Sequence, residues 1–483
     1  MLSLTSSQPG FHGVGVSHTG SGKFKVQGDV NIGGTVNNGQ GYDEIIRKLR
    51  TTNPEDDKIR IEEQKGGLLY DSSRWILSHE DFGRWRDDAE SVLLWIKGDP
   101  GKGKTMLLCS IINDLVKETP KERNVVYFFC QATDARLDNA EAVLRGLLYG
   151  LRKQEALKKR LVAEYKDAGD QLFEDANHWA ALSRILLSTL EDPDLPRTYL
   201  VIDGLDECRH NLDKLLSLIT QISSSRAKVL VSSRYWPEIE DGLSATAGKV
   251  MLRLEMNSDA VSSAVGIYIN HKVDELARSK KYSPEQKELV RQHLISNANN
   301  TFLWVALICQ ALGNPRLRKW NTEKTLTAFP PGLNALYDRM ARQVFASEDA
   351  ELCRQVLGLV SLVFQPIRLE EVLSLIEDPA LFPDDKVSLR QIVDLCGSFL
   401  SLRGELIYFV HQSAKEFLTE KLAGKLFLKG VISQHLVIAE QSLQAMSLKL
   451  HRNMYELQAP MMSISKKRDK YDISTTAAWY TSF

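Results

Sequence analysis

The feature that most constrains the fold of this chain is a short apolar run that leads directly into a loop rich in glycine and lysine. The run is Val92-Leu-Leu-Trp-Ile96, which has the length and composition of a buried strand. The loop after it consists of Gly98, Asp99, Pro100, Gly101, Lys102, Gly103, Lys104 and Thr105. A stretch of helical character, 105–118, follows. Strand, loop and helix in this order predict a phosphate-binding loop.

Such a loop binds phosphate because glycines let consecutive backbone N–H groups curl around the anion, while the helix N-terminus adds a positive dipole end. We expect Lys104 to contact the β- and γ-phosphates of a nucleotide, and the Thr105 hydroxyl to ligate Mg²⁺. The expected cofactors are therefore ATP/ADP, or GTP/GDP, together with Mg²⁺.

Short apolar runs alternate with helical stretches through the following part of the chain, at 125–129, 199–202, 229–231 and 250–254. Strands of this kind are covered on both faces, which indicates a parallel sheet with helices on both faces. From about 257 to 420 the pattern is mostly helical, except for two strands joined around Gly404 within 399–410. We predict an α/β P-loop NTPase domain followed by helical and winged-helix domains.

These patterns divide the chain into six segments. They are a leader (1–41), a helical connector (42–90), the P-loop NTPase domain (91–255), a helical domain (256–329), a winged-helix domain (330–425) and a helical C-terminal segment (426–483). The leader holds ten of the 30 glycines, and its residues 24–32 alternate apolar and polar side chains. It is either an unstructured leader or a segment that stacks with copies of itself as cross-β.

A cluster of acids follows the run at 199–202. Asp203 stands where that strand should end, at the sheet edge where α/β domains bind ligands, and we expect it to ligate the metal. Asp206 and Glu207 come three and four residues later, and Glu207 is the expected base that polarises water. A structural role in the turn after the strand is equally open for Asp206 and Glu207.

Two further residues are candidates on weaker patterns. Arg234 follows the run at 229–231, where its guanidinium could sense the γ-phosphate, and pairing with a local acid is the alternative. His411 follows the second strand of the expected hairpin, where a lone histidine is more often structural.

Composition excludes several classes of protein. A formal net charge of -1 gives no reason to expect nucleic-acid binding. The longest apolar run, 302–309, is far shorter than the roughly 20 residues of a membrane-spanning helix. The first residues show no secretory signal, and the six cysteines lack the spacing of a zinc site. We expect reduced thiols and a cytoplasmic location.

Several stretches taken together resemble fungal NACHT-type proteins, whose P-loop module is also described as nephrocystin-like. They are Gly67–Leu77, Phe82–Asp88, Leu94–Met106, Tyr127–Asp134, Asp203–Cys208, Thr301–Ala306, Pro331–Tyr337 and Val410–Leu418. The resemblance covers about residues 67 to 460. Residues 14–34 also loosely resemble the short amyloid-forming signalling motifs of some family members.

The resemblance implies a STAND architecture, in which the NACHT, helical and winged-helix domains close over bound ADP and His411 touches the β-phosphate. Exchange of ADP for ATP then opens the module, which oligomerises and signals through an N-terminal effector. Such proteins are implicated in non-self recognition, heterokaryon incompatibility and programmed cell death. Relatives usually continue into ligand-sensing repeats, whereas this sequence stops at Phe483, so we expect a truncated gene model or fragment.

Two alternatives to a signalling switch stay open. One is a P-loop enzyme of ordinary turnover, such as a kinase, although no acceptor-substrate site is visible in the sequence. The other is a scaffold that uses the domain for protein contacts only, against which the intact Lys104, Thr105 and Asp203 argue.

Overall fold

The structure, a computed structural model, describes residues 38–449 except 119–122, 245, 377–385 and 397–398. Its centre is a five-stranded sheet whose paired strands are all parallel, in the order β2-β3-β4-β1-β5. The strands are β1 (Leu93–Lys97), β2 (Arg123–Phe129), β3 (Arg197–Asp203), β4 (Lys228–Ser233) and β5 (Lys249–Arg253). Each of the five expected runs forms a strand, and the predicted α/β fold is confirmed.

Alternate side chains of each strand enter two different cores, because successive residues of a strand point to opposite faces. Leu94 and Ile96 of β1 belong to one core, whereas Leu93 and Trp95 belong to the other. The first core is covered by α4 and α5, and the second by α6, α9 and α10. The helices of this part are α5 (Lys104–Glu118), α6 (Ala140–Gly150), α7 (Glu155–Ala168), α8 (Gln171–Glu174), α9 (His178–Leu190), η2 (Leu205–Glu207), α10 (Leu212–Ile222), α11 (Pro237–Gly242) and η3 (Leu254–Asn257).

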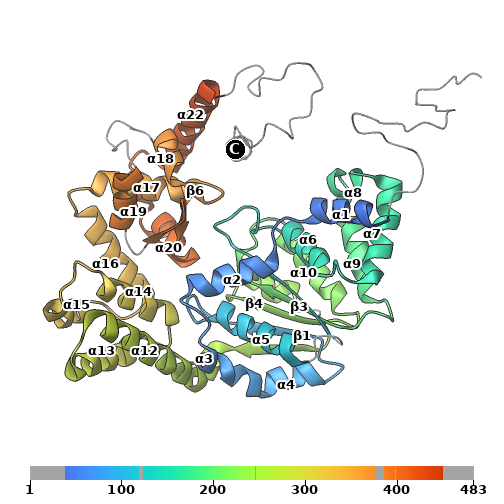
Figure 1. The fold of residues 1–483 in the computed structure, drawn as a ribbon, viewed down its shortest axis with the longest axis horizontal. Coiled ribbons are helices and arrows are strands. Elements are labelled where there is room, and N and C mark those ends of the chain that lie inside the picture. The colour runs from blue at the N-terminus through green and yellow to red at the C-terminus, as the bar shows by residue number, and fades with distance from the viewer. Residues whose placement is uncertain (1–37, 119–122, 245, 377–385, 397–398, 450–483) are drawn as a thin grey trace, which may run out of the picture.

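Before the sheet, the chain forms a series of short helices: α1 (Asn38–Leu49), α2 (Pro54–Gln64), α3 (Tyr70–Ser73), η1 (Arg74–Ser78) and α4 (Glu80–Asp87). The first of them lies against α6 and α7, at the outer side of the sheet domain (Figure 1). It begins at Asn38, inside the segment that we assigned to the leader. The strand and amyloid expectations for the rest of the leader fall outside the described residues.

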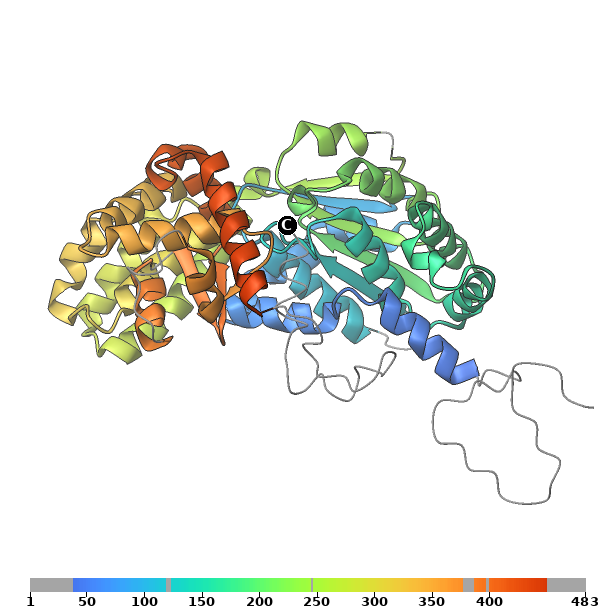
Figure 2. The same ribbon diagram turned by 90° about the horizontal axis from the view of Figure 1, so that it is seen from above.

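Two helical layers beside the sheet form the second lobe of the molecule (Figures 1 and 2). The first layer contains α12 (Ser258–Lys280), α13 (Pro284–Asn297), α14 (Phe302–Gly313), η4 (Lys319–Asn321) and α15 (Thr322–Thr327). The second contains α16 (Leu333–Phe345), α17 (Ala350–Leu362), β6 (Ile367–Arg368), α18 (Leu369–Leu375), α19 (Lys386–Leu395), β7 (Leu400–Arg403), β8 (Leu406–Phe409), α20 (Gln412–Glu416), η7 (Phe417–Lys421), α21 (Ala423–Leu426) and α22 (Val431–Lys449).

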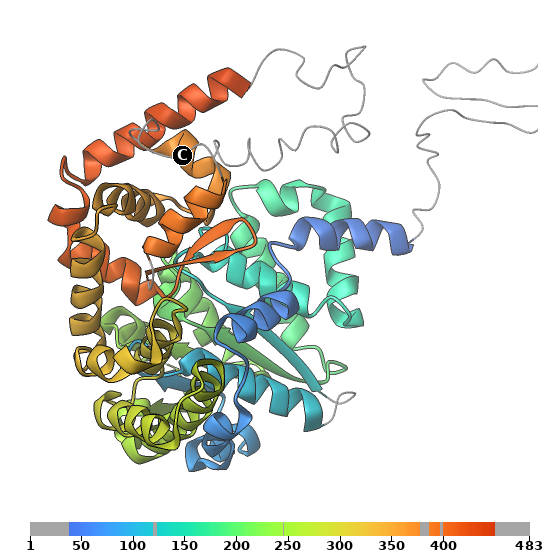
Figure 3. The ribbon, with the colours of Figure 1, turned by 60° about the vertical axis from the view of Figure 1, so that its left-hand side comes forward.

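The expected hairpin is present in the second layer. β7 and β8 pair antiparallel around Gly404, whose φ of 56° suits a residue without a side chain, and β6 adds a third strand. Figure 3 shows this small sheet on the side of the winged-helix part that faces the P-loop domain. None of the helices in the described part of the chain has the length and apolar character needed to cross a bilayer.

One apolar core joins the two lobes. The cluster that contains Leu94 of the parallel sheet continues through Trp304 of α14 to Leu357 of α17, and all three side chains are fully buried. Since burial of apolar surface is the main favourable term in such contacts, this continuity stabilises the observed arrangement of the lobes. In this arrangement α20 lies beside the end of β4, where Glu416 contacts Arg234.

Candidate functional site

The phosphate-binding loop leaves the end of β1 and runs into the N-terminus of α5. Gly101 and Gly103 have φ values of 76° and 85°, a region that glycine enters without the steric cost of a side chain. A Cβ on Gly101 would lie 2.8 Å from the Cβ of Leu303 in α14. The glycines therefore permit both the curl of the loop and its close approach to the helical layer.

The two lysines of the loop have different partners. Lys104 Nζ donates hydrogen bonds to the carbonyl oxygens of Gly98 (2.5 Å) and Asp99 (3.1 Å), so its ammonium group lies over the loop itself. Burial lowers its pKa, and the charge of Asp206 opposes that effect. Lys102 Nζ instead donates to the carbonyl oxygen of Asn299, 2.8 Å away. The ammonium group of Lys104 thus stays over the loop, whereas that of Lys102 is directed away from it.

Asp203 ends β3, and the structure brings it to Thr105 at the start of α5. Burial raises the pKa of the Asp203 carboxyl, while hydrogen bonds from Ser232 and Thr105 partly offset the rise. The strand that carries Ser232 is β4, which lies between β3 and β1. A hydroxyl and a carboxylate beside a phosphate-binding loop fit Mg²⁺, which takes one or two protein oxygens and completes its shell with water and phosphate.

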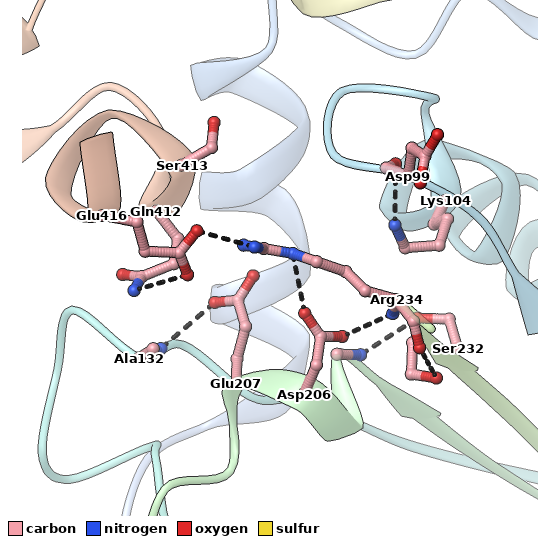
Figure 4. Close-up of polar contacts among 12 residues, drawn as sticks. Asp99, Lys104, Ala132, Asp206, Glu207, Ser232, Arg234, Gln412, Ser413 and Glu416 are labelled. Carbon is pink, nitrogen blue, oxygen red and sulfur yellow. Dashed lines mark hydrogen bonds and ion pairs between the residues drawn. The ribbon is translucent and has the colours of Figure 1, made fainter. Parts of the chain in front are cut away.

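Arg234, just after β4, lies between two carboxylates (Figure 4). Its backbone N–H donates to Asp206 Oδ1 at 2.9 Å, and its Nε lies 3.0 Å from Asp206 Oδ2. On the other side, Nη1 donates to Oε2 of Glu416 in α20, 2.6 Å away. Both oxygens of Asp206 are thus engaged by Arg234, which matches the structural alternative for Asp206 and the acid-pairing alternative for Arg234.

Glu207 has a different environment from its neighbour Asp206. Its Oε2 accepts a hydrogen bond from the backbone N–H of Ala132 at 3.1 Å, and its carboxyl forms no ion pair with a described residue (Figure 4). Burial and the charge of Asp206 raise the pKa of Glu207 to about 7. A carboxyl group with this pKa can accept a proton from water near neutral pH, which is the property of a general base.

His411 is the N-cap of α20. Its Nδ1 accepts a hydrogen bond from the backbone N–H of Ser413 at 3.1 Å. Burial holds the pKa of His411 well below its ordinary value, and the cations Lys65, Arg234 and Lys104 add to this effect. The ring is therefore neutral at pH 7, and since Nδ1 accepts, its proton is on Nε2.

These side chains line one cavity of about 570 Å³, a volume in the range of small-molecule sites. Residues 100–105 of the phosphate-binding loop, Asp203, Glu207 and Arg234 line the cavity from the P-loop domain, and His411 lines it from the second lobe. The structure thus gathers the candidate site residues, except Gly98 and Asp99, around a single cavity, with Asp206 and Arg234 paired to each other.

The apolar end of the cavity was not predicted from the sequence. It is formed by the segment after α2, with Leu68 and Trp75, and by Tyr268 and Phe302 of the helical layer. Gly66 and Gly67, with φ values of 83° and 87°, turn the chain at the end of α2 toward this cavity. The adjacent glycines, and the family resemblance of the stretches 67–77 and 301–306, were the available signals, because the apolar residues themselves look like ordinary core.

Comparison with known proteins gives one family-model match and one curated relative. Residues 71–234 match the model described as Nephrocystin 3, N-terminal. Over 441 residues, or 88% of this chain, the sequence is 47% identical to the vegetative incompatibility protein HET-E-1 of Podospora anserina. The chain spans 32% of the length of that relative.

Comparison with solved structures gives matches of low similarity, including an ATPase and an ORC1 protein. A Walker-type ATPase of Pyrococcus abyssi is 12% identical. The match covers 72% of this chain and 94% of the ATPase chain, with a TM-score of 0.33. The Aeropyrum pernix ORC1 protein in complex with DNA is 14% identical. The match covers 78% of this chain and 96% of the ORC1 chain, with a TM-score of 0.28. Similarity at this level says nothing about what the present chain binds.

Proposed function

Starting from a chain that is homologous to the vegetative incompatibility protein HET-E-1 and carries a nephrocystin-type P-loop module, we propose that it is a nucleotide-dependent signalling switch. It binds ATP or ADP with Mg²⁺, or the guanine equivalents, and it oligomerises when activated. One observation carries the proposal. The cavity beside the phosphate-binding loop is also lined by His411 of the winged-helix part, so a ligand bound there can contact both lobes at once.

The roles of the phosphate-binding residues follow from their positions. Lys104 is drawn from the loop carbonyls to the β-phosphate when a nucleotide enters, because a phosphate is the stronger partner for an ammonium group. The Nε2–H of His411, which lines the same cavity, would donate a hydrogen bond to that phosphate. ADP therefore links the lobes and stabilises the closed form.

Hydrolysis uses the acids at the end of β3. Thr105 and Asp203 would hold Mg²⁺, which would supply positive charge to the phosphates. Glu207 accepts a proton from the attacking water, for which its pKa of about 7 is suited. A slow reaction of this kind resets the switch after activation.

The direction of switching follows from linkage. A triphosphate shifts the equilibrium toward an open form only if it binds that form more tightly than the closed one. Opening separates α20 from the P-loop domain and exposes buried surface, which then drives self-association. We propose that the leader recruits the downstream effector, and that the role lies in non-self recognition, heterokaryon incompatibility or programmed cell death. The name of the relative supports an incompatibility role, because it describes that protein as a vegetative incompatibility protein.

The domain boundaries are part of this proposal. We assign 91–255 to nucleotide binding, 256–329 to the helical layer and 330–425 to the winged-helix part that closes the site. We assign 426–483 to a helical C-terminal segment.

The first experiment is to measure the nucleotide carried by the purified protein. The protein is denatured, and the supernatant is separated by ion-exchange HPLC, which also distinguishes adenine from guanine nucleotides. We expect near-stoichiometric diphosphate, and ligand at about 100 times its Kd adds roughly 2.7 kcal/mol of stability. An empty site with rapid multiple turnover would instead indicate an ordinary P-loop enzyme. An empty site that binds no added nucleotide would indicate a scaffold.

A further inference from the structure

Arg234 connects the two lobes through a single guanidinium group. Its Nε faces Asp206 of the P-loop domain at 3.0 Å, and its Nη1 faces Glu416 of α20 at 2.6 Å. The three side chains are 15%, 4% and 26% exposed, in the order Arg234, Asp206 and Glu416. This partly buried cation thus has one partner from each lobe.

Glu416 is itself held in place by its own helix. Its Oε1 accepts a hydrogen bond from Nε2 of Gln412, one turn earlier, at 3.1 Å, while its Oε2 accepts from Arg234 (Figure 4). The carboxylate therefore has a defined orientation in the closed form. It occupies a hydrogen-bonding position on a guanidinium that lines the nucleotide cavity.

A carboxylate and a phosphate are alternative partners for the same guanidinium, because both present oxygen atoms that match its planar donors. A phosphate added beyond the β-position brings further negative charge into a site that already holds Asp206, Glu207 and Glu416. Glu416 and that phosphate compete for the Nη donors of Arg234, so a phosphate bound there weakens the bond to Glu416. A diphosphate has no γ-phosphate, so it does not compete with Glu416 for Arg234.

We propose that Glu416 determines the preference of the closed form for diphosphate over triphosphate, by occupying in α20 the place on Arg234 that a γ-phosphate takes. Binding of a triphosphate then costs the contact between Arg234 and α20, and the winged-helix part loses its ionic link to the P-loop domain. This inference rests on the proposed function, since it assumes that the cavity holds a nucleotide.

A simple structural ion pair would behave differently. Its loss would destabilise the closed arrangement, and it would weaken the binding of both nucleotides alike. A residue that competes with the γ-phosphate changes the ratio of the two affinities. The ratio therefore separates the two roles, and stability alone does not.

The test compares the full chain with Glu416→Gln, which keeps the size and hydrogen-bonding capacity of the side chain but removes its charge. Kd is measured for ADP and for the non-hydrolysable β,γ-imido analogue of ATP, each with Mg²⁺. We expect the ratio of the analogue Kd to the ADP Kd to fall about tenfold, which corresponds to about 1.4 kcal/mol. Glu416→Asp retains the charge and should leave most of the original ratio intact.

Two controls make the result specific. Glu420→Gln removes the charge of an exposed acid one turn further along the chain, and it should leave the ratio unchanged. In an Arg234→Ala background, Glu416→Gln should have no further effect on the ratio, since the shared partner is gone.

Wild-type protein that binds both nucleotides, with an unchanged ratio in Glu416→Gln, would overturn this inference and leave the proposed function standing. An equal loss of both affinities would also overturn it, in favour of a structural ion pair. Wild-type protein that binds neither nucleotide would overturn the proposed function and this inference together.

Discussion

The ammonium group of Lys104 lies 2.5 Å from the carbonyl oxygen of Gly98, at the other end of its own loop. The second lysine of the loop, Lys102, reaches out of it to Asn299 at 2.8 Å. Two residues of the same type, two positions apart, are thus directed to different places. This difference provides a matched pair of variants for the phosphate site.

Lys104→Ala should weaken the binding of ADP and ATP by about 100-fold, because it removes a charged hydrogen-bond donor from the phosphates. Lys102→Ala should change both affinities only slightly, since its bond to Asn299 lies outside the phosphate position. Equilibrium binding of a fluorescent nucleotide to the two variants measures both effects. Equal affinities for the two variants would refute the assignment of Lys104.

Asp203→Asn should leave nucleotide affinity nearly intact and reduce Mg²⁺-dependent hydrolysis by about 100-fold, as expected when a fixed charge is lost at the reacting centre. An asparagine can still accept the hydrogen bond from Ser232, so the local fold is retained. Phosphate release is measured with Mg²⁺ and with EDTA. Full Mg²⁺-dependent activity in this variant would exclude a metal-binding role for Asp203.

The pKa of Glu207 predicts a specific pH dependence of stability. It is about 7 in the folded protein against an ordinary value of 4.5, so the folded state binds more protons than the unfolded state between these two values. The free energy of unfolding therefore falls as pH rises through this window, by an amount on the order of 3 kcal/mol. Above about pH 7 the full loss of folding stability caused by ionised, buried Glu207 is present.

Glu207→Gln removes this contribution while preserving the acceptor for the Ala132 N–H. The stability of the variant relative to wild type should therefore increase between about pH 5 and about pH 8. Chemical denaturation of both nucleotide-free proteins at the two pH values measures the difference. Parallel pH profiles would show that Glu207 ionises normally.

His411→Ala should accelerate the release of ADP about tenfold, because the Nε2–H donor to the β-phosphate is lost. His411→Gln retains a donor and should release ADP at an intermediate rate. Release is followed by displacing a fluorescent ADP analogue with excess unlabelled ADP in a stopped-flow instrument. An unchanged release rate in the alanine variant would mean that the winged-helix part does not contact the nucleotide.

Several features could be read from local sequence because they depend on short-range backbone geometry. The loop from Gly98 to Thr105 needs glycine at its strained positions, and an apolar run must precede it. Asp203 follows a run whose composition marks a buried strand. The hairpin around Gly404 likewise follows from alternation and one turn residue. Each of these patterns extends over about ten residues, and the residues in each pattern form the element that we expected.

The partners of these residues were decided by tertiary structure alone. Neighbouring residues do not reveal that β4 is inserted between β1 and β3, or that the segment after α2 closes the apolar end of the cavity. The sequence by itself determined which residues can bind phosphate and metal. Only the packing of the lobes decided that Arg234 meets Glu416, 182 residues away, because contacts at such separations depend on how whole helices and sheets bury their apolar faces together.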